Sequence, residues 1–149
     1  RLCKELAAAC AGIQADVVVG PAMGAVTLAY ELGRSLGTRA LFTERVDGKM
    51  ALRRGFSIEP GERVLVVEDV LTTGGSAGEV IQDVVQPSGA RAVGVCALID
   101  RGGAARFAPT RVHALLKMDI PTYRPEACPL CAAAQPLVKP GSRTAPPAG

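Results

Sequence analysis

The segment "VLVVEDVLTTGGSAGEV" at residues 64–80 decides the fold of this chain. It opens with an apolar, β-branched run of the kind found in buried parallel strands. This run ends in two adjacent carboxylates, Glu68 and Asp69, and a turn rich in threonine and glycine separates them from a helical pattern. A strand, a turn and a helix in this order predict an α/β fold whose ligand site lies beyond the carboxyl end of the strand.

The rest of the chain continues this alternation of strands and helices. The hydrophobic pattern predicts helices over 1–12, 24–36 and 75–86, and strands over 16–20, 39–42, 63–68, 91–100 and 111–118. In the first helix, Leu2, Leu6 and Cys10 share one face; in the second, the inward positions are Val26, Ala29, Leu32 and Leu36. We therefore predict an α/β fold with a mostly parallel sheet flanked by helices.

The composition is that of one folded domain. The chain has 149 residues, 48% of them hydrophobic, and we assign residues 1–125 to a core domain and 126–149 to a Pro-rich segment and a disordered tail. Aromatic residues make up only 3% and the net charge is only +3, so a nucleic-acid partner is not expected. No apolar run approaches the ~20 residues of a membrane-spanning helix, so we expect no membrane partner.

The cysteines and the first residue carry two further expectations. Five cysteines at irregular spacing argue against a disulfide framework and for the reducing cytoplasm. The chain opens at Arg1, inside a helical pattern that has no capping residue before it, so we expect a segment to precede it.

The glycine-rich turn suits a phosphate monoester. Gly74 and Gly75 let the backbone turn its N–H groups toward one point, and Thr72, Thr73 and Ser76 add hydroxyl donors. The helix that follows adds its positive end. The turn has neither the lysine of a P-loop nor the spacing of a dinucleotide fingerprint. The alternative is an ordinary helix-capping turn.

The two carboxylates favour a phosphate site over an ordinary helix-capping turn. Strand alternation directs Glu68 and Asp69 to opposite sides, so one can bind vicinal hydroxyls while the other engages a divalent cation or its waters. A frayed strand end, or an aspartate that caps the turn, is the alternative. A sugar phosphate accounts for the acids and the turn together. Two more polar clusters, "GPAMG" (20–24) and "DRGG" (100–103), follow other predicted strands and are expected at the same sheet edge.

These motifs resemble a known family. "VLVVEDVLTTGGS" closely resembles the 5-phosphoribosyl 1-diphosphate (PRPP) signature of the type I phosphoribosyltransferases. Four further stretches are similar to the bacterial members that act on orotate, namely "DVVVGPAMGAVTLAYELG", "LFTERVDGKMALRRGF", "ALIDRGG" and "DIPTYRPEACPLC". The resemblance runs from residue 1 to about residue 143.

The resemblance implies a type I phosphoribosyltransferase fold and a reaction. The phosphoribosyl group of PRPP passes to orotate, giving orotidine 5′-monophosphate and diphosphate in de novo UMP biosynthesis. It also implies Mg²⁺ bound mainly through the substrate, with no protein metal ligand assigned, and a homodimer. The segment expected before Arg1 would then supply much of the hood over the orotate ring.

The resemblance also assigns the site residues. Glu68 and Asp69 would bind the ribose 2- and 3-hydroxyls, residues 72–76 the 5-phosphate, and Thr72 and Arg101 the orotate. The full set expected to bind PRPP comprises Gly20, Ala22, Met23, Gly24, Arg45, Lys49, Glu68, Asp69, Val70, Leu71, Thr72, Thr73, Gly74, Gly75 and Ser76. Many relatives carry a lysine in the loop at 20–24, where this chain has Ala22-Met23-Gly24.

Residues 44–55 show no period, which predicts a long loop, and a loop of this kind in a compact domain is usually a lid or a linker. It carries Arg45, Lys49, Arg53 and Arg54, and a charge run of this kind, considered alone, favours a solvated surface loop. The resemblance implies a lid that closes over the neighbouring subunit's site, with Arg45 and Lys49 as catalytic cations.

Two weaker candidates and two alternative functions stay open. The pair Cys128 and Cys131 in "CPLC" has three possible roles: a structural role, half of a zinc site, or a redox pair. His113, the only histidine, is expected to be a packing or surface residue. A purine-type phosphoribosyltransferase shares the PRPP signature but not "GKMALRRGF" or "CPLC". A regulatory module that senses PRPP without turnover is the other alternative, against which the basic lid and Arg101 argue.

Overall fold

The computed structural model describes residues 1–136. Chain contacts divide it into two units, Arg1–Asp119 and Ile120–Gly149. The first unit contains, in order, α1 (Leu2–Ala9), β1 (Val17–Pro21), α2 (Val26–Leu36), β2 (Arg39–Val46), β3 (Lys49–Leu52), β4 (Arg63–Leu71), α3 (Gly75–Val80), the π-helix η1 (Ile81–Val85), β5 (Arg91–Asp100), the 3-10 helix η2 (Gly103–Phe107) and β6 (Val112–Lys117). The second contains η3 (Pro125–Ala127) and α4 (Pro129–Ala132). The predicted tail beyond residue 136 lies outside the described residues.

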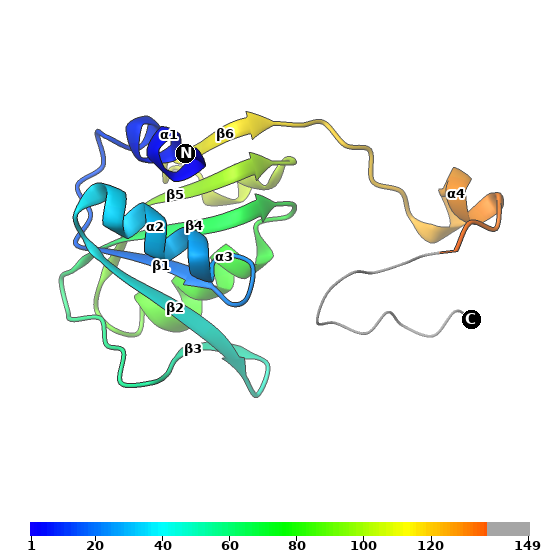
Figure 1. Ribbon diagram of the computed structural model, residues 1–149. Coiled ribbons are helices and arrows are strands. Elements are labelled where there is room, and N and C mark those ends of the chain that lie inside the picture. The colour runs from blue at the N-terminus through cyan, green and yellow to red at the C-terminus, as the bar shows by residue number, and fades with distance from the viewer. Residues whose placement is uncertain (137–149) are drawn as a thin grey trace. The chain divides into compact units, whose positions relative to one another are not determined.

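One six-stranded sheet organises the first unit. Its strand order is β3-β2-β1-β4-β5-β6, and only the β2–β3 pair is antiparallel (Figure 1). The predicted α/β fold with a mostly parallel sheet is therefore confirmed. The chain moves outward from β1 to β2 on one side and from β4 to β5 and β6 on the other. The two central strands, β1 and β4, thus flank the topological switch point, where ligands bind in open α/β sheets.

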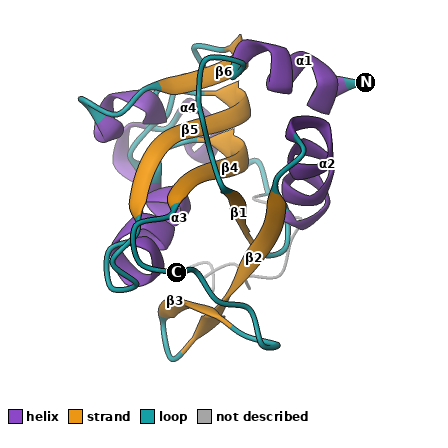
Figure 2. Ribbon diagram, turned by 90° about the vertical axis from the view of Figure 1, so that its left-hand side faces the viewer, coloured by secondary structure: helices purple, strands orange, loops and turns teal. Residues whose placement is uncertain are grey.

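Helices cover both faces of the sheet, and each face has its own core. The helices α1 and α2 lie on one face and α3 on the other (Figure 2). Alternate residues of β4 divide between the two cores: Leu65 and Val67 pack with α1 and α2, while Val64 and Val66 pack with α3 and η1. This two-sided burial explains why β4 reads as a continuous apolar run rather than an alternating one.

The predicted helical faces are largely confirmed. In α1, Leu6 and Cys10 are fully buried, but Leu2 is 58% exposed, so the predicted apolar face ends one turn short of the amino terminus. In α2, Ala29 and Leu32 are buried as predicted. Gly37, in the left-handed conformation, ends α2 where the sequence predicted.

The prediction of a loop over 44–55 is wrong for residues 44–52. Residues 43–46 pair with 49–52 as an antiparallel hairpin, and Asp47 and Gly48 form its two-residue turn with φ of 48° and 83°. Both turn residues thus have positive φ, which is the requirement that makes Asp-Gly a strong hairpin signal. The lid expected from the sequence is therefore a hairpin at the edge of the sheet.

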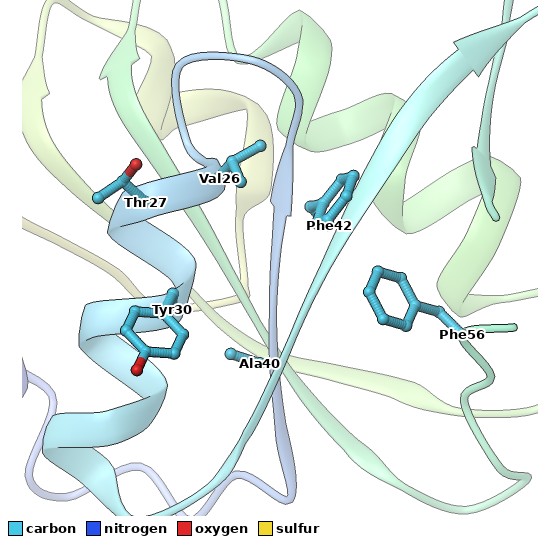
Figure 3. Close-up of a pocket in the computed structure, with 6 residues that line it drawn as sticks. All are labelled: Val26, Thr27, Tyr30, Ala40, Phe42 and Phe56. Carbon is cyan, nitrogen blue, oxygen red and sulfur yellow. The ribbon is translucent and has the colours of Figure 1, made fainter. Parts of the chain in front are cut away.

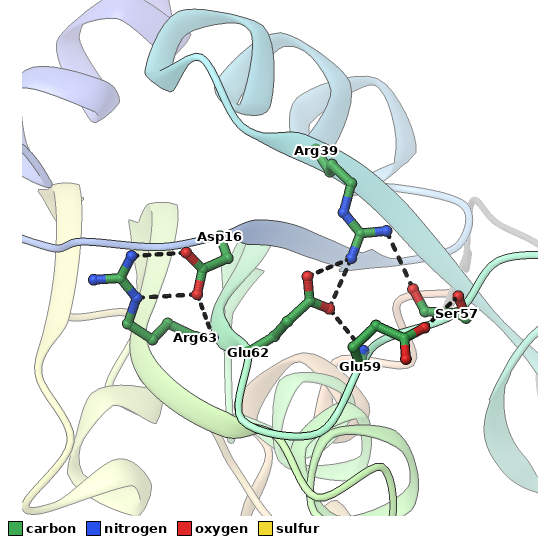
Figure 4. A network of polar contacts seen from close by, with 6 residues as sticks. All are labelled: Asp16, Arg39, Ser57, Glu59, Glu62 and Arg63. Carbon is green, nitrogen blue, oxygen red and sulfur yellow. Dashed lines mark hydrogen bonds and ion pairs between the residues drawn. The ribbon is translucent and has the colours of Figure 1, made fainter.

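Ion pairs connect the amino ends of the strands, opposite the loops at the switch point. Arg63, at the start of β4, donates through Nε and Nη2 to the Asp16 carboxylate at 3.0 and 2.7 Å (Figure 4). Arg39, at the start of β2, donates to both oxygens of Glu62 at 2.7 Å, and Glu62 also accepts the backbone N–H of Glu59. The Arg63 guanidinium holds the pKa of the Asp16 carboxyl well below its usual range.

The cysteines depart from the expectation drawn from their spacing. Cys10 and Cys96 are joined as a disulfide between the end of α1 and β5, with Cα atoms 7.5 Å apart. Irregular spacing did not predict this pair, because the two residues meet only when α1 packs on the sheet. Within residues 1–136, Cys3, Cys128 and Cys131 are free thiols.

None of the helices described in residues 1–136 has the length and apolar character that a membrane span requires.

Candidate functional site

The two carboxylates stand at the end of the central strand β4. The strand continues three residues past its predicted end at 68, to Leu71, so both acids belong to the sheet. Glu68 is 8% exposed and Asp69 is half-buried. The Asp69 carboxylate lies against Gly24, where an added Cβ would come within 2.5 Å of Oδ2. The loop after β1 and the acid of β4 are therefore in direct contact across the switch point.

The acids differ in protonation as well as in burial. The pKa of the Glu68 carboxyl is raised from 4.5 to about 8, mainly by burial and then by the charge of Asp69 and a hydrogen bond with its side chain. Glu68 is thus largely protonated at neutral pH when the site is empty. Asp69 Oδ1 accepts the N–H of Val70 at 2.8 Å, which holds its carboxylate at the strand end.

The predicted phosphate cradle is a tight turn that leads directly into α3. Thr72 and Thr73 are exposed, and Gly74 adopts φ 70°, which L side chains rarely take. A Cβ on Gly74 would also meet the Phe107 ring at 2.8 Å, so η2 packs directly against the turn. The first helical N–H groups, at Gly75 and Ser76, lie where α3 begins and have no acceptors within the helix.

The loop after β1 lies on the other side of the acids. All of β1 is buried through its last residue, Pro21, and the N–H of Ala22 donates to the carbonyl of Thr43 on β2 at 2.8 Å. The peptide between Ala22 and Met23 is cis, and the Met23 side chain is 77% exposed. The predicted loop residues thus face the switch point with backbone groups and without a cationic side chain of their own.

Arg101 is positioned at the same edge, next to the cradle. Its backbone N–H donates to the carbonyl of Leu71 at 2.8 Å, which fixes the end of β5 to the turn after β4. Its buried Nε has no hydrogen-bond partner in the described part of the chain. The neighbouring carboxylate of Asp100 is 6% exposed and accepts the N–H groups of Gly102 and Ala104. The guanidinium therefore retains donors for another acceptor.

The basic hairpin is tied to the helix behind the cradle. Arg45 forms an ion pair with Glu79 of α3 and donates to the carbonyl of Gly48 at 2.6 Å. The N–H of Met50 donates to Asp83 Oδ2 at 3.0 Å. Lys49, beside the turn, is exposed. In this conformation Arg45 is engaged within its own chain, whereas Lys49 projects freely.

Sequence reasoning missed the groups that hold this hairpin. Glu79 and Asp83 are four residues apart, on the side of α3 and η1 that faces β2 and β3. Their spacing is ordinary for a helix surface, and no signal in the sequence marked them. Of the other basic residues predicted in the lid, Arg54 pairs with Glu44 at 3.0 Å and lies 6.0 Å from the centre of the Phe42 ring.

The described residues do not form a metal site by themselves. Among residues 1–136, no cluster of three or more His, Cys, Asp or Glu side chains could hold a metal ion. Glu68 and Asp69 provide at most a two-carboxylate edge. This donor set fits Mg²⁺ that arrives with phosphate ligands, because Mg²⁺ commonly keeps its waters and takes one or two carboxylates beside substrate phosphates.

An apolar pocket of about 370 Å³ lies elsewhere, between α2, β2 and the residues after β3 (Figure 3). Its lining comprises Val26, Thr27, Tyr30, Ala40, Phe42 and Phe56. None of the predicted site residues lines it, and it offers two hydroxyls but no charge. A polyanionic sugar phosphate therefore matches the polar edge at the switch point and not this pocket.

The residues at the switch point form one chemically coherent set. Backbone N–H groups and hydroxyls at 72–76 suit a phosphate, and the neighbouring acids suit a diol. The loop at 20–24 lies against Asp69, and Arg101 carries a free donor beside the turn. The set can bind and orient an anionic sugar and a second, acceptor-bearing molecule.

Comparison with known proteins shows which family the chain is similar to. The phosphoribosyl transferase domain family matches residues 1–114. An orotate phosphoribosyltransferase of Pelotomaculum thermopropionicum is 55% identical over 142 residues, covering 95% of this chain and 74% of that protein. The orotate phosphoribosyltransferase of Caldicellulosiruptor saccharolyticus is 52% identical with the same coverage of both chains.

Solved structures share the fold. Orotate phosphoribosyltransferase of Mycobacterium tuberculosis, in complex with 5-phospho-alpha-D-ribosyl 1-diphosphate, superposes with a TM-score of 0.65 at 28% identity, covering 78% of this chain and 71% of that one. An adenine phosphoribosyltransferase of Thermoanaerobacter pseudethanolicus gives a TM-score of 0.68 at 19% identity, covering 78% of each chain. At that identity, the second match shows the fold alone.

Proposed function

The chain belongs to the phosphoribosyl transferase family, and from this premise we propose that it transfers the phosphoribosyl group of PRPP to orotate. The products are orotidine 5′-monophosphate and diphosphate, and the reaction belongs to de novo pyrimidine biosynthesis. The observation that carries the proposal is the convergence of the acid pair, the cradle and Arg101 at one edge of the sheet.

Each group has one role in the proposed binding of PRPP. The backbone and hydroxyls of residues 72–76 hold the 5-phosphate, with Val70 and Leu71 leading into the turn. Glu68 and Asp69 accept the ribose 2- and 3-hydroxyls. The loop from Gly20 to Gly24 wraps the diphosphate with backbone N–H groups. This arrangement leaves the anomeric carbon facing the space beside Arg101.

The reaction needs positioning and charge stabilisation more than covalent chemistry. The bond from the anomeric carbon to diphosphate breaks as N1 of orotate approaches, and the ribose then resembles an oxocarbenium ion. Mg²⁺, bound mainly through the substrate, would neutralise the departing diphosphate. Arg45 and Lys49 of the hairpin add cationic donors to the same oxygens and exclude water. Binding both reactants in the reactive orientation supplies the remaining rate enhancement.

Thr72 and Arg101 select the base. Orotate carries a carboxylate and two ring carbonyls, so its site needs a cation and oriented donors. The guanidinium of Arg101 can grip such acceptors with paired hydrogen bonds, which a lysine cannot reproduce. A purine offers no carboxylate to this cation, so the purine-type alternative is disfavoured.

The assembly and the compartment complete the proposal. We propose a homodimer in which the hairpin of one subunit acts on the site of its partner, which requires Arg45 to leave Glu79. PRPP is too highly charged to cross a bilayer unaided, so we place the enzyme in the cytoplasm.

Two measurements test the proposal. Calorimetry should show Mg²⁺-dependent binding of PRPP, weakened by Asp69→Asn, and turnover should be fast with orotate, slow with uracil and absent with adenine or hypoxanthine. PRPP binding without turnover of any base would favour the regulatory module. Preferential use of a purine would overturn the choice of orotate while leaving the sugar-phosphate site in place.

A further inference from the structure

The second unit carries a pair of cysteines that the proposed reaction does not use. Cys128 is the N-cap residue of α4, and Cys131 lies within the single helical turn that follows. Proline occupies the first position of that turn, between the two thiols in the sequence "CPLC". The carbonyl of Cys128 accepts the N–H of Ala132 at 3.0 Å, which closes the turn around the pair.

Both thiols are reduced and accessible. Cys128 is half-buried, Cys131 is exposed, and neither belongs to the disulfide that joins Cys10 and Cys96. Cys128 and Cys131 are three residues apart across one helical turn, a spacing that places the two sulfur atoms on the same side of the turn. Rotation of the side chains can therefore bring them to bonding distance without unfolding the turn.

The surroundings of the two sulfur atoms are unequal. The backbone N–H of Cys131 lowers the pKa of the Cys128 thiol, and the Cys131 thiol and the N–H of Leu130 act in the same direction. The hydrogen bond to Cys128 raises the pKa of the Cys131 thiol. This difference separates a nucleophilic first cysteine from a second cysteine that stays protonated until it is needed.

We propose that Cys128 and Cys131 form a reversible dithiol–disulfide couple that exchanges with small-molecule or protein disulfides. In the first step, the Cys128 thiolate attacks one sulfur of the oxidant, forming a mixed disulfide and expelling one thiolate. In the second step, Cys131 loses its proton and attacks the Cys128 sulfur, and the second half of the oxidant leaves as a thiolate. The chain loses two protons and two electrons, and one disulfide becomes two thiols.

A structural metal is the competing use of the same pair. A closed zinc site needs four ligands, and a cysteine pair supplies only two. Within residues 1–136, no third or fourth cysteine, histidine or carboxylate completes such a group around them. The dithiol needs no further partner, so the geometry favours the redox couple.

The experiment measures which cysteines react with oxidised glutathione. The full chain is incubated with it, the remaining thiols are alkylated, and the disulfides are mapped by mass spectrometry. We expect a bond between Cys128 and Cys131, reversed by dithiothreitol. Cys131→Ser should stop at glutathione attached to Cys128, and Cys128→Ser should react at least about tenfold more slowly at Cys131.

Cys3→Ser is the matched control, because Cys3 is also a free thiol but has no neighbouring cysteine in the sequence. This variant should form the bond between Cys128 and Cys131 as fast as the parent chain. Equal reactivity of the two single variants, or oxidation without that bond, would overturn the proposal. Stoichiometric zinc in the purified chain, whose removal is required before oxidation, would do so in favour of the metal.

Discussion

At the scale of single residues, two carboxyl groups adjacent in the sequence acquire different properties from their tertiary surroundings. Glu68 is buried in the sheet and Asp69 faces the loop after β1. Burial of one acid beside the charge of the other keeps a proton on Glu68 up to about pH 8. Substrate hydroxyls or a cation at this edge would replace that proton, so ligand binding and protonation are linked.

The first prediction concerns Glu68 and the pH dependence of stability. The folded-state pKa of about 8 lies above the ordinary 4.5, so the stabilisation is complete below pH 4.5 and is lost as the pH rises to about 8. In this window the group lowers the free energy of unfolding by up to ~1.4 kcal/mol per pH unit. Glu68→Gln cannot ionise and should lack this slope. Urea unfolding at several pH values measures it.

The control for that prediction is Asp69→Asn, which keeps Glu68 but removes the neighbouring charge. It should retain part of the slope, since burial is the larger cause of the shift in the pKa of Glu68. Parallel stability curves for the parent chain and Glu68→Gln would contradict the assignment of a protonated Glu68.

The second prediction tests Arg101 as the residue that reads the base. Arg101→Lys keeps the charge but loses the planar fork, so kcat/KM for orotate should fall roughly 10²-fold or more, as expected when a charged hydrogen bond worth ~2–3 kcal/mol is lost. The affinity for PRPP, measured by calorimetry, should stay within about twofold of the parent value. Arg106→Lys, a change at another arginine of the same region, is the matched control. An equal loss of PRPP affinity would move Arg101 to the sugar-phosphate site.

At the scale of elements, the hairpin shows most clearly what the sequence does and does not predict. The Asp47-Gly48 turn was visible in the sequence and is a strong hairpin signal, so β2 and β3 could have been predicted from local rules. The contacts with Glu79 and Asp83 could not, because they depend on how the edge of the sheet packs on α3 and η1. Local turn chemistry is encoded in adjacent residues, whereas docking is a tertiary property.

The third prediction separates the two contacts that dock the hairpin. Asp83 accepts the N–H of Met50, which is only 5% exposed, so Asp83→Ala leaves a buried donor and should lower stability by ~1–2 kcal/mol. The ion pair of Glu79 and Arg45 is about one-third exposed, so Glu79→Ala should cost less than ~1 kcal/mol. Amide hydrogen exchange at Met50 should accelerate much more in the first variant. Equal acceleration in both would show that the ion pair, not the buried bond, holds the hairpin.

At the scale of the whole molecule, the order of the strands was less predictable than their existence. The strand over 91–100 was predicted to the residue, whereas β4 runs to Leu71 because pairing with β5 continues beyond the two acids. Clustering of the polar loops followed from the parallel sheet, since the carboxyl ends of such strands share one edge. The disulfide of Cys10 and Cys96 required the packing of α1, which no local pattern specifies.

The strand order also bears on where the hairpin acts. Lys49 lies on β3 at the edge of the sheet, and Asp69 lies on β4, three strands away. At ~4.8 Å per strand, the two backbones are roughly 14 Å apart, which exceeds the reach of a lysine side chain. In the proposed dimer, the hairpin of the second subunit would supply this cation.

The last prediction tests that arrangement in the dimer. Lys49→Ala should lower kcat far more than it raises the KM for PRPP, since the cation acts as diphosphate leaves. Mixing Lys49→Ala subunits with Asp69→Asn subunits then gives heterodimers in which one site combines an intact acid pair with the partner's intact hairpin. With random exchange, about a quarter of the parent activity should return, because half the dimers are mixed and each holds one complete site. If each hairpin served its own chain, every site would lack one of the two groups, and the mixture would show only the average of the two inactive variants.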